Sequence, residues 1–295
     1  MPEVLRVSPD LIEEVARDLY LRALKVLPAD IQAGIAHLAA VETHERGHAV
    51  LATLQHNIVV AAQTDGLLCQ DTGLPLYRIT IGRDVQVDGL AMKEAIRAGC
   101  ARATREHPFR SSVVHPLSRH NGQDSCGIRI PAIDIDFDER VGVLDILMIP
   151  KGSGSENQSW LKMALPADGV AAIQRFVIDC VLAAGGKACP PTVVGVGVGG
   201  SADLCLKLAK LAATRPLGSR CEDPQGAALE AALSGAVNRL GIGAQGLGGD
   251  ATAFAVHIEL AATHITLNPV AVNLQCHSAR RARAQITREG VRYGD

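Results

Sequence analysis

The sequence predicts a mixed α/β fold, because amphipathic helical patterns alternate along the chain with short apolar runs typical of strands. A chain of 295 residues is long enough for one large domain or two smaller ones. We expect one large domain over residues 1–295. Its core is expected to be aliphatic, since 47% of the residues are hydrophobic and only 3% are aromatic. These patterns do not give the order of the strands.

The N-terminal part, about residues 1–63, is expected to be helical. Ser8 and Pro9 are typical of a helix start, because a serine side chain caps the first turn and proline fits its first position. Pro28 is expected to end this helix. Two further helices are predicted over residues 29–45 and 47–63.

Strands and helices are then expected to alternate to the end of the chain. Strands are predicted at residues 74–82, 128–137, 141–149, 192–200 and 253–260, and helices at 90–105, 168–184, 201–214 and 224–240. Residues 107–127 are polar and rich in turn residues, which predicts a long functional loop. Asp134, Asp136 and Asp138 are interpreted as a solvated strand face, because the pattern of a calcium-binding loop fails at Glu139 and Asp145.

Net charge and the N-terminus restrict the location and the partners of the chain. A net charge of −2 gives no general attraction to nucleic acids or anionic membranes. The apolar runs are shorter than the roughly 20 residues that a membrane span needs. The N-terminal sequence MPEVLRVSPD lacks the basic and apolar segments of a signal peptide. We therefore expect a cytoplasmic protein with no nucleic-acid or membrane partner.

Three of the eight cysteines are candidate metal ligands. The chain has no CxxC pair, which argues against a secreted disulfide framework. Cys69, Cys189 and Cys276 each lie in or beside a loop with glycine, proline or short polar neighbours. Three thiolates around a four-iron cluster leave one iron open to act as a Lewis acid. The spacing alone also fits buried or idle thiols.

Five motifs together resemble the α subunit of the iron–sulfur hydro-lyases, the class I fumarases and L(+)-tartrate dehydratases. They occur in family order between about residues 45 and 283. The motifs are CQDTG at 69–73, KGSGSENQSWLKM at 151–163, ACPPTVVGVGVGG at 188–200, RPLGSR at 215–220 and HxxxxPVAVNxxCH at 264–277.

The resemblance implies a cofactor and a set of substrate-binding residues. Cys69, Cys189 and Cys276 would hold a [4Fe–4S] cluster whose open iron binds the hydroxyl and one carboxylate of a 2-hydroxy acid. Other residues match family positions at the substrate. These are Gln70 and Asp71 in CQDTG, Arg110 for a carboxylate, His264 close to the reacting group, and Gly152 and Gly154, where backbone amides can approach.

The implied reaction is the reversible dehydration of a small hydroxy-dicarboxylate, with malate to fumarate as the first choice. In the family, a further domain or β subunit completes the pocket and supplies the base, so we expect a β subunit partner and a homo- or hetero-oligomer. A basic C-terminal stretch is interpreted as a solvated tail or a partner-facing patch. Its members are Arg280, Arg281, Arg283, Arg288 and Arg292.

Several alternatives remain at this level. Residues 121–126 depart from the NTGDN-like run of fumarate-specific members, which leaves tartrate or mesaconate as the substrate. A non-enzymatic iron–sulfur sensor is an alternative of another class. Gly195, Gly197 and Gly200 satisfy a GxGxxG pattern, but no second strand leads to an acidic residue at the expected distance, which argues against a dinucleotide site.

Overall fold

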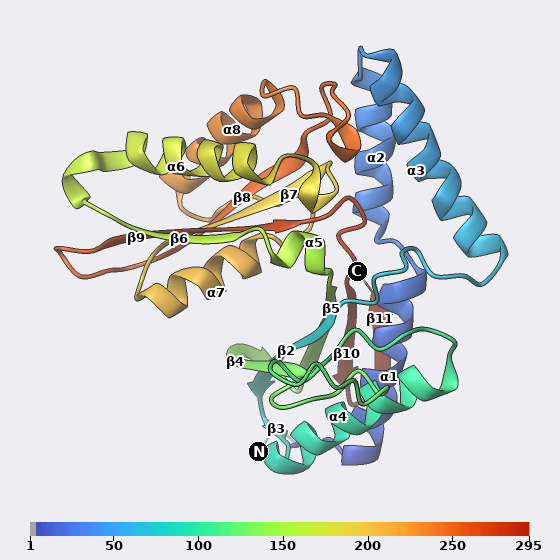
Figure 1. Cartoon of the computed structure of the whole chain (residues 1–295). Helices are drawn as coiled ribbons and strands as arrows, with labels where there is room; N and C mark the ends of the chain where they lie inside the picture. Colours follow the sequence, from blue (N-terminus) through green and yellow to red (C-terminus); the bar gives the residue numbers. More distant parts are fainter. Residues whose placement is uncertain (1–3, 295) are drawn as a thin grey trace. The chain divides into compact units, whose positions relative to one another are not determined.

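The computed structural model describes residues 4–294, which form two compact units (Figure 1). The first unit contains the described residues of 1–28, 61–152 and 280–295, and the second contains 29–60 and 153–279. Both units combine helices with a mixed sheet, which confirms the predicted α/β fold class.

The first unit is built on a five-stranded sheet with the order β11-β10-β5-β2-β4. Only β2 and β4 run parallel, and the other neighbours are antiparallel. Helix α1 contacts β5, β10 and helix α4. The bounds are β2 Leu74–Arg83, β4 Ala132–Val141, β5 Leu144–Lys151, β10 Ala282–Thr287, β11 Gly290–Gly294, α1 Pro9–Lys25 and α4 Gly89–Glu106, with a short parallel pair of β1 Leu5–Arg6 and β3 Val85–Gln86.

Helix α1 begins where the sequence predicts. The Ser8 side chain accepts a hydrogen bond from the Leu11 amide at 3.3 Å, and Pro9 occupies the first turn. Ile12, Val15 and Leu19 are fully or almost fully buried in the core of the first unit. The apolar stripe that defines this helix in the sequence is therefore the face that packs.

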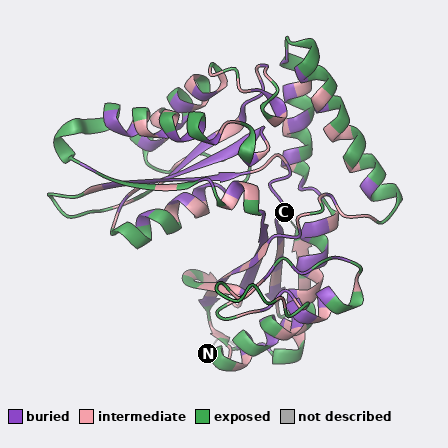
Figure 2. Cartoon of the chain, in the orientation of Figure 1, coloured by how far each residue is buried: buried purple, intermediate pink, exposed green. Residues whose placement is uncertain are grey.

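The second unit is built on a four-stranded sheet with the order β6-β9-β7-β8, in which only β7 and β8 are parallel. Helices α6 and α8 cover one face and α7 covers the other (Figure 1). Strands β7 and β9 form the buried centre of this unit (Figure 2). The bounds are α2 Ala29–Val41, α3 Glu45–Gln63, α5 Ser153–Glu156, β6 Ser159–Ala164, α6 Gly169–Ala184, β7 Thr192–Gly199, α7 Ala202–Ala212, α8 Pro224–Asn238, β8 Ala253–Ala261 and β9 Asn268–Gln275, with 3₁₀ turns η1 Pro166–Asp168, η2 Gly185–Ala188 and η3 Ala244–Gly246.

Two glycines of the GxGxxG pattern serve the packing of α7 on β7. A Cβ atom on Gly195 would lie 2.1 Å from the Ala209 carbonyl oxygen, and one on Gly197 would lie 2.1 Å from the Cys205 carbonyl oxygen. Only glycine allows the helix to approach this closely. Helix packing thus accounts for these glycines without a dinucleotide.

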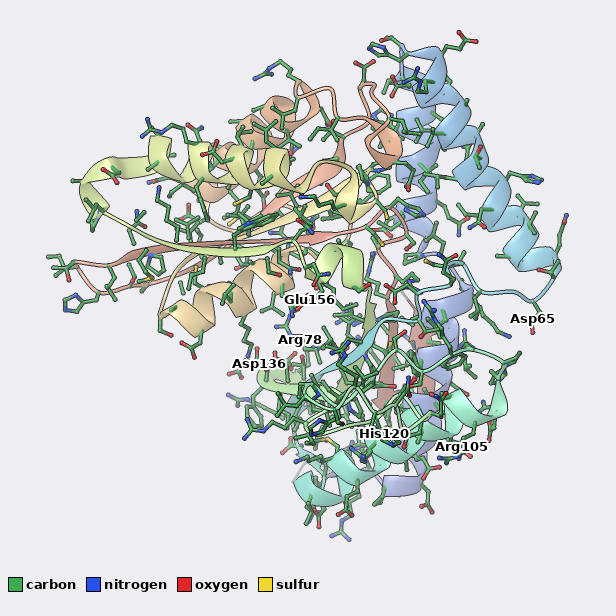
Figure 3. All side chains as sticks on the ribbon, in the orientation of Figure 1. Asp65, Arg78, Arg105, His120, Asp136 and Glu156 are labelled. Atoms are coloured by element: carbon green, nitrogen blue, oxygen red, sulfur yellow. The ribbon has the colours of Figure 1, made fainter. Side chains whose placement is uncertain are left out.

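The strand predicted at 128–137 is displaced. It begins at Ala132 because Gly127 and Ile130 pair across a tight turn before Pro131. Apolar side chains of this strand also reach solvent, since Ile135 is 43% exposed and Phe137 is 72% exposed. Strand β4 is the sheet edge, where Asp136 forms an ion pair with Arg78 of β2 at 3.5 Å (Figure 3).

Two helical stretches are long and apolar enough to cross a membrane by length and composition. They are Pro9–Val41, with 33 residues, and Pro166–Ala188, with 23 residues. The continuous apolar runs are shorter than these stretches, because scattered polar residues interrupt the runs without making the helices polar. Pro28 divides the first stretch into α1 and α2, and α1 packs in a core. Core helices pass the same test.

The C-terminal arginines are not a solvated tail throughout. Arg280 and Arg281 are buried, and Arg283 on β10 donates three hydrogen bonds of 2.6–3.0 Å to Asp145 on β5. Arg140 also donates to Asp145 at 2.9 Å, and the Gln285 side-chain amide donates to the same carboxylate at 3.0 Å. Burial alone would raise the pKa of Asp145, but these hydrogen bonds outweigh it and hold the pKa below its ordinary value.

We expect the first unit to lose stability in acid through Asp145. A depressed carboxyl pKa stabilises the fold above the unfolded-state pKa of about 3.9, and that contribution is lost as the pH falls below it. Asp145→Asn should lower the free energy of unfolding at pH 7 by about 1.5–3 kcal/mol, since it removes the buried carboxylate that pairs with the partly exposed Arg140 and Arg283. Urea unfolding from about pH 3 to 7 should show a flatter pH dependence for the variant. Asp138→Asn, at a carboxylate that is 31% exposed, is the control, and an unchanged slope in Asp145→Asn would contradict the assignment.

Candidate active site

The CQDTG loop leads directly into β2 in the first unit. Asp71 shapes this loop, because its Oδ1 accepts the Gly73 amide at 2.9 Å and its own amide donates to the Cys69 sulfur at 3.4 Å. Gly73 has φ 74°, and a Cβ atom there would lie 2.6 Å from the Pro150 carbonyl carbon, so glycine is required. Cys69 is half-buried and forms no disulfide.

Thr72 ties the CQDTG loop to the loop that carries Arg110. Its Oγ1 donates to the Arg110 carbonyl oxygen at 2.6 Å and lies 2.9 Å from Ser112 Oγ. Thr72 is fully buried, whereas Arg110 and Gln70 are exposed. The structure therefore brings the two predicted substrate-binding loops together and leaves the Arg110 and Gln70 side chains accessible.

Gly152 lies beside Asp71 where β5 ends. A Cβ atom at this position would be 3.3 Å from Asp71 Oδ2 and 3.8 Å from Nη2 of Arg280. The glycine thus keeps a side chain out of the space next to the Asp71 carboxylate. Cys69, Gln70, Asp71 and Gly152 share one region of the first unit, and none of them comes from a regular element.

Cys189 and Cys276 lie at the same end of the four-stranded sheet in the second unit. Cys189 precedes β7 and Cys276 follows β9, and these strands are antiparallel neighbours with Val193 opposite Gln275. The His277 amide donates to the Cys189 carbonyl oxygen at 2.9 Å. Cys189 adopts the left-handed conformation with φ 53°, a strained state for a residue other than glycine.

Gln245 is a supporting residue that the sequence did not reveal. Its amide donates to the Pro190 carbonyl oxygen at 2.7 Å, and its side-chain Nε2 lies 3.1 Å from the same oxygen and 3.2 Å from His277 Nδ1. It thereby joins the segments that follow Cys189 and Cys276. The only signal in the sequence is its place in the glycine-rich run GIGAQGLGG, which reads as an ordinary loop.

Gly154 lies on the short helix α5, close to the turn that precedes Cys189. A Cβ atom on Gly154 would be 2.8 Å from the Lys187 carbonyl oxygen. This contact explains why glycine is required here, and it places α5 against the segment that carries Cys189.

His264 lies away from the two thiols of its own unit. It is exposed in the turn between β8 and β9, at the opposite end of β9 from Cys276. The 8 residues of β9 span about 26 Å at roughly 3.3 Å per residue. Its Nδ1 interacts with Thr266 at 2.9 Å. Within the second unit, the structure does not bring His264 to Cys189 or Cys276.

The remaining thiols differ from the three loop cysteines. Cys100, Cys126, Cys180 and Cys205 are buried. Burial raises the pKa of Cys180 to about 12 and that of Cys205 to about 11, which makes both poor ligands and nucleophiles. Among the described residues, the half-buried cysteines are Cys69, Cys189, Cys276 and Cys221.

The donors around the loop cysteines suit thiolate ligands. The Asp71 amide donates to Cys69, and the Ser278 hydroxyl lies 3.2 Å from the Cys276 sulfur. Hydrogen bonds of this kind to the sulfurs stabilise iron–sulfur ligation and tune its potential. The observed residues therefore fit a cluster held by thiolates.

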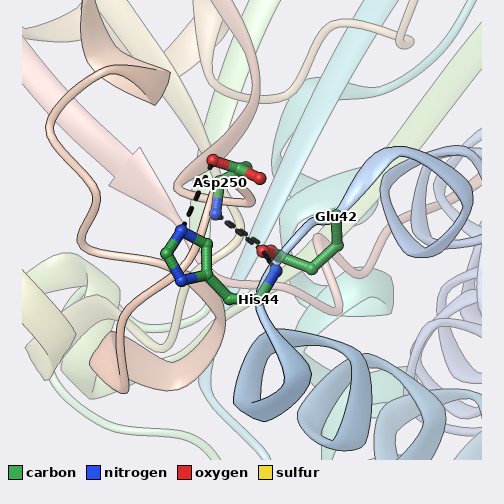
Figure 4. A group of neighbouring side chains, drawn as sticks. All are labelled: Glu42, His44 and Asp250. Atoms are coloured by element: carbon green, nitrogen blue, oxygen red, sulfur yellow. Dashed lines mark hydrogen bonds and ion pairs between the residues drawn. The ribbon is translucent and has the colours of Figure 1, made fainter.

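A second group of potential ligands, Glu42, His44 and Asp250, lies in the second unit (Figure 4). Their ligand atoms are within 4.8 Å of one another. Glu42 is 4% exposed, and its two oxygens already accept the amides of Asp250, Ala251, Thr43 and His44 at 3.0–3.2 Å. These contacts make Glu42 a cap that fixes the glycine-rich loop to the end of α2.

We expect Glu42→Ala to be strongly destabilising. It would leave the amides of Asp250 and Ala251 without their carboxylate acceptor, at a cost of about 2–4 kcal/mol in the free energy of unfolding. Urea denaturation measures the change. Glu45→Ala, three residues away at an exposed position, should change the free energy by less than about 1 kcal/mol. Equal effects of the two substitutions would show that the Glu42 contacts contribute little.

Comparison with known proteins identifies the family. The profile of the family described as Fumarate hydratase (Fumerase) matches residues 13–285. The chain belongs to the fumarate hydratase family. Members are hydro-lyases, so the predicted resemblance and enzyme class are both confirmed.

Relatives of this fumarate hydratase family member cover almost the same length. The Methanocaldococcus jannaschii protein named "Putative L(+)-tartrate dehydratase subunit alpha" is 43% identical over 278 residues, covering 93% of this chain and 97% of that protein. The L(+)-tartrate dehydratase subunit alpha of Escherichia coli K12 is 30% identical over 255 residues, covering 86% of this chain and 84% of that subunit.

Proposed function

We propose that this chain is the α subunit of an iron–sulfur hydro-lyase that reversibly dehydrates a small 2-hydroxy dicarboxylate, with malate to fumarate as the reaction. The observation that carries the proposal is the grouping of Asp71, Gly152 and the Arg110 loop beside Cys69 in the first unit. This grouping places a carboxylate and a thiol next to the loop that carries the exposed Arg110.

Cys69, Cys189 and Cys276 would hold a [4Fe–4S] cluster. When bound, the cluster would supply a Lewis-acidic iron that weakens the C–O bond of the leaving hydroxyl. The half-buried loop settings of the three thiols and the donors around Cys69 and Cys276 support this assignment.

The protein residues orient the substrate and handle its charges. The Arg110 guanidinium matches the planar geometry of a carboxylate, and the Gln70 amide can donate to the same group. Asp71 accepts a hydrogen bond from the substrate hydroxyl and can hold a proton at a carboxylate oxygen. Gly152 and Gly154 allow the backbone to approach the ligand closely.

For His264 to lie near the reacting group, as proposed, it has to come from another chain. About 26 Å of strand separates it from Cys276 within one sheet, so a second copy or the partner subunit has to bring the histidine to the site. A homo- or hetero-oligomer would meet this requirement.

The catalytic base is proposed to come from a β subunit. The curated relatives carry the words "subunit alpha" in their names, which implies a second subunit in those enzymes. Assembly of this chain with such a partner, and its cytoplasmic location, remain predictions.

L(+)-Tartrate is the second candidate substrate. Two observations favour it. The relatives at 43% and 30% identity are named as tartrate dehydratase subunits, and residues 121–126 depart from the run of fumarate-specific members. Mesaconate remains a third possibility for the same loop.

Anaerobic co-purification with the candidate β subunit tests the function. We expect about four iron and four sulfide per chain, visible absorption of the cluster, and turnover of malate or tartrate. Iron and sulfide without turnover of malate, tartrate or mesaconate would favour the sensor alternative. A colourless, iron-free protein after anaerobic preparation would contradict the proposal.

A further inference from the structure

Arg280 is a buried cation with two unpartnered nitrogens. It is 2% exposed and is the largest fully buried side chain among the described residues. Its Nε and Nη1 atoms have no hydrogen-bond partner in the described part of the chain. Buried charges are normally paired because an unpaired charge is costly away from water. The buried Arg280 guanidinium therefore requires an anionic partner.

Other arginines of the chain show how unusual this is. Arg78, Arg102 and Arg215 each have one buried nitrogen without a partner, but each guanidinium forms an ion pair. Arg283, three residues after Arg280, is paired with Asp145 at 2.6 Å. Arg280 differs because two of its nitrogens are unsatisfied.

The guanidinium of Arg280 lies next to the proposed substrate site. Its Nη2 and Asp71 Oδ2 approach the same point at Gly152, at 3.8 Å and 3.3 Å. Burial raises the pKa of Tyr20, and the positive charge of Arg280 acts in the opposite direction. The Tyr20 hydroxyl in turn donates to the Thr72 carbonyl oxygen in the CQDTG loop at 3.4 Å.

The chemistry on the two sides of Gly152 is complementary to a 2-hydroxy acid. Asp71 is an acceptor for a hydroxyl, and Arg280 is a donor for a carboxylate. Lys151, which is 1% exposed and directly precedes Gly152, adds a second buried cation to this region. Such a region disfavours neutral ligands and favours anions.

We propose that Arg280 binds one carboxylate of the substrate and that Arg110 binds the other, so that the site selects dicarboxylates over monocarboxylic hydroxy acids. This deepens the proposed function and rests on it for the identity of the substrate. The unpartnered guanidinium is costly in the free protein, and the ligand relieves that cost. Arg280 thus lowers the folding stability of the free protein and strengthens the binding of the dicarboxylate.

The test compares Arg280→Met and Arg280→Lys with the paired-arginine control Arg283→Met in the enzyme co-purified with its β subunit. Arg280→Met should keep or raise the melting temperature, because an apolar side chain replaces an unpaired charge. Arg283→Met should lower it, because it removes a partner of Asp145. Arg280→Met should raise the KM for the dicarboxylate by about 10- to 100-fold, with unchanged iron content, and Arg280→Lys should have a smaller effect.

Direct binding separates this inference from the proposed reaction. Malate and tartrate should raise the melting temperature of the native protein more than lactate does, and Arg280→Met should abolish the difference even if no turnover is found. Three outcomes would overturn the inference. In the first, the Arg280→Met variant still prefers dicarboxylates. In the second, it loses as much stability as Arg283→Met. In the third, it loses its iron or its β subunit but still binds dicarboxylates.

Discussion

Cys276→Ser is expected to abolish both iron binding and dehydratase activity, and Cys69→Ser and Cys189→Ser should do the same. A serine hydroxyl is a far weaker ligand for iron than a thiolate. A cluster held by only three protein ligands has no further ligand to replace a lost one. Activity should fall by at least about 1,000-fold, since the Lewis acid is lost together with the cluster. Iron and sulfide analysis after anaerobic purification, with the visible spectrum, measures the effect separately from turnover.

Cys221→Ser is the matched control for these variants. Cys221 is also half-buried and also lies in a loop of the second unit, so it has similar access to solvent. We expect this variant to retain iron, colour and activity. A loss of iron in Cys221→Ser, or full iron content in any of the other three, would mean that the ligand set is wrong.

Asp71→Asn is expected to lower kcat by about 100- to 10,000-fold with little change in iron content. Asparagine keeps the acceptor oxygen that Asp71 Oδ1 offers to the Gly73 amide at 2.9 Å, so the loop should keep its shape. The substitution removes only the charge and the ability to hold a proton. Steady-state kinetics on malate and tartrate, with iron analysis of the same preparation, gives the comparison.

Two further variants separate the chemical role of Asp71 from its structural role. Asp71→Ala also removes the turn hydrogen bond and should lower iron content as well, because the Cys69 loop is no longer fixed. Asp65→Asn changes an exposed aspartate of the same unit that pairs with Lys25, and it should leave kcat unchanged. If Asp71→Asn loses iron and activity in parallel, Asp71 supports the loop and takes no part in the reaction.

Much of the local structure follows from the sequence. Ser8 and Pro9 start α1, Asp223 caps α8 by accepting the amides of Gln225 and Gly226 at 2.8 Å and 3.0 Å, and both signals act within one helical turn. The pairing of strands is different. Strand β10 lies beside β5, so Arg283 meets a residue 138 positions earlier in the chain, and no local pattern encodes such a contact.

Burial is the second property that the sequence does not provide. Arg280 and Arg283 belong to the same basic stretch, yet one is buried with unsatisfied nitrogens and the other is paired on a sheet. His264 and Cys276 lie only 12 positions apart in one motif, but an extended strand carries them to opposite ends of a sheet. A motif determines how far apart two residues are along the chain, but the fold determines how far apart they are in space.

The sequence by itself determined the α/β class, the helix starts and the family, because caps, periodicity and motifs act between residues close in the chain. The tertiary structure alone decided that Asp71 and Arg280 approach one another at Gly152, that Gln245 joins the segments after Cys189 and Cys276, and that Glu42 caps a loop some 208 positions away. These contacts depend on how strands pair and which charges are buried, and both are set by the packing of the whole chain.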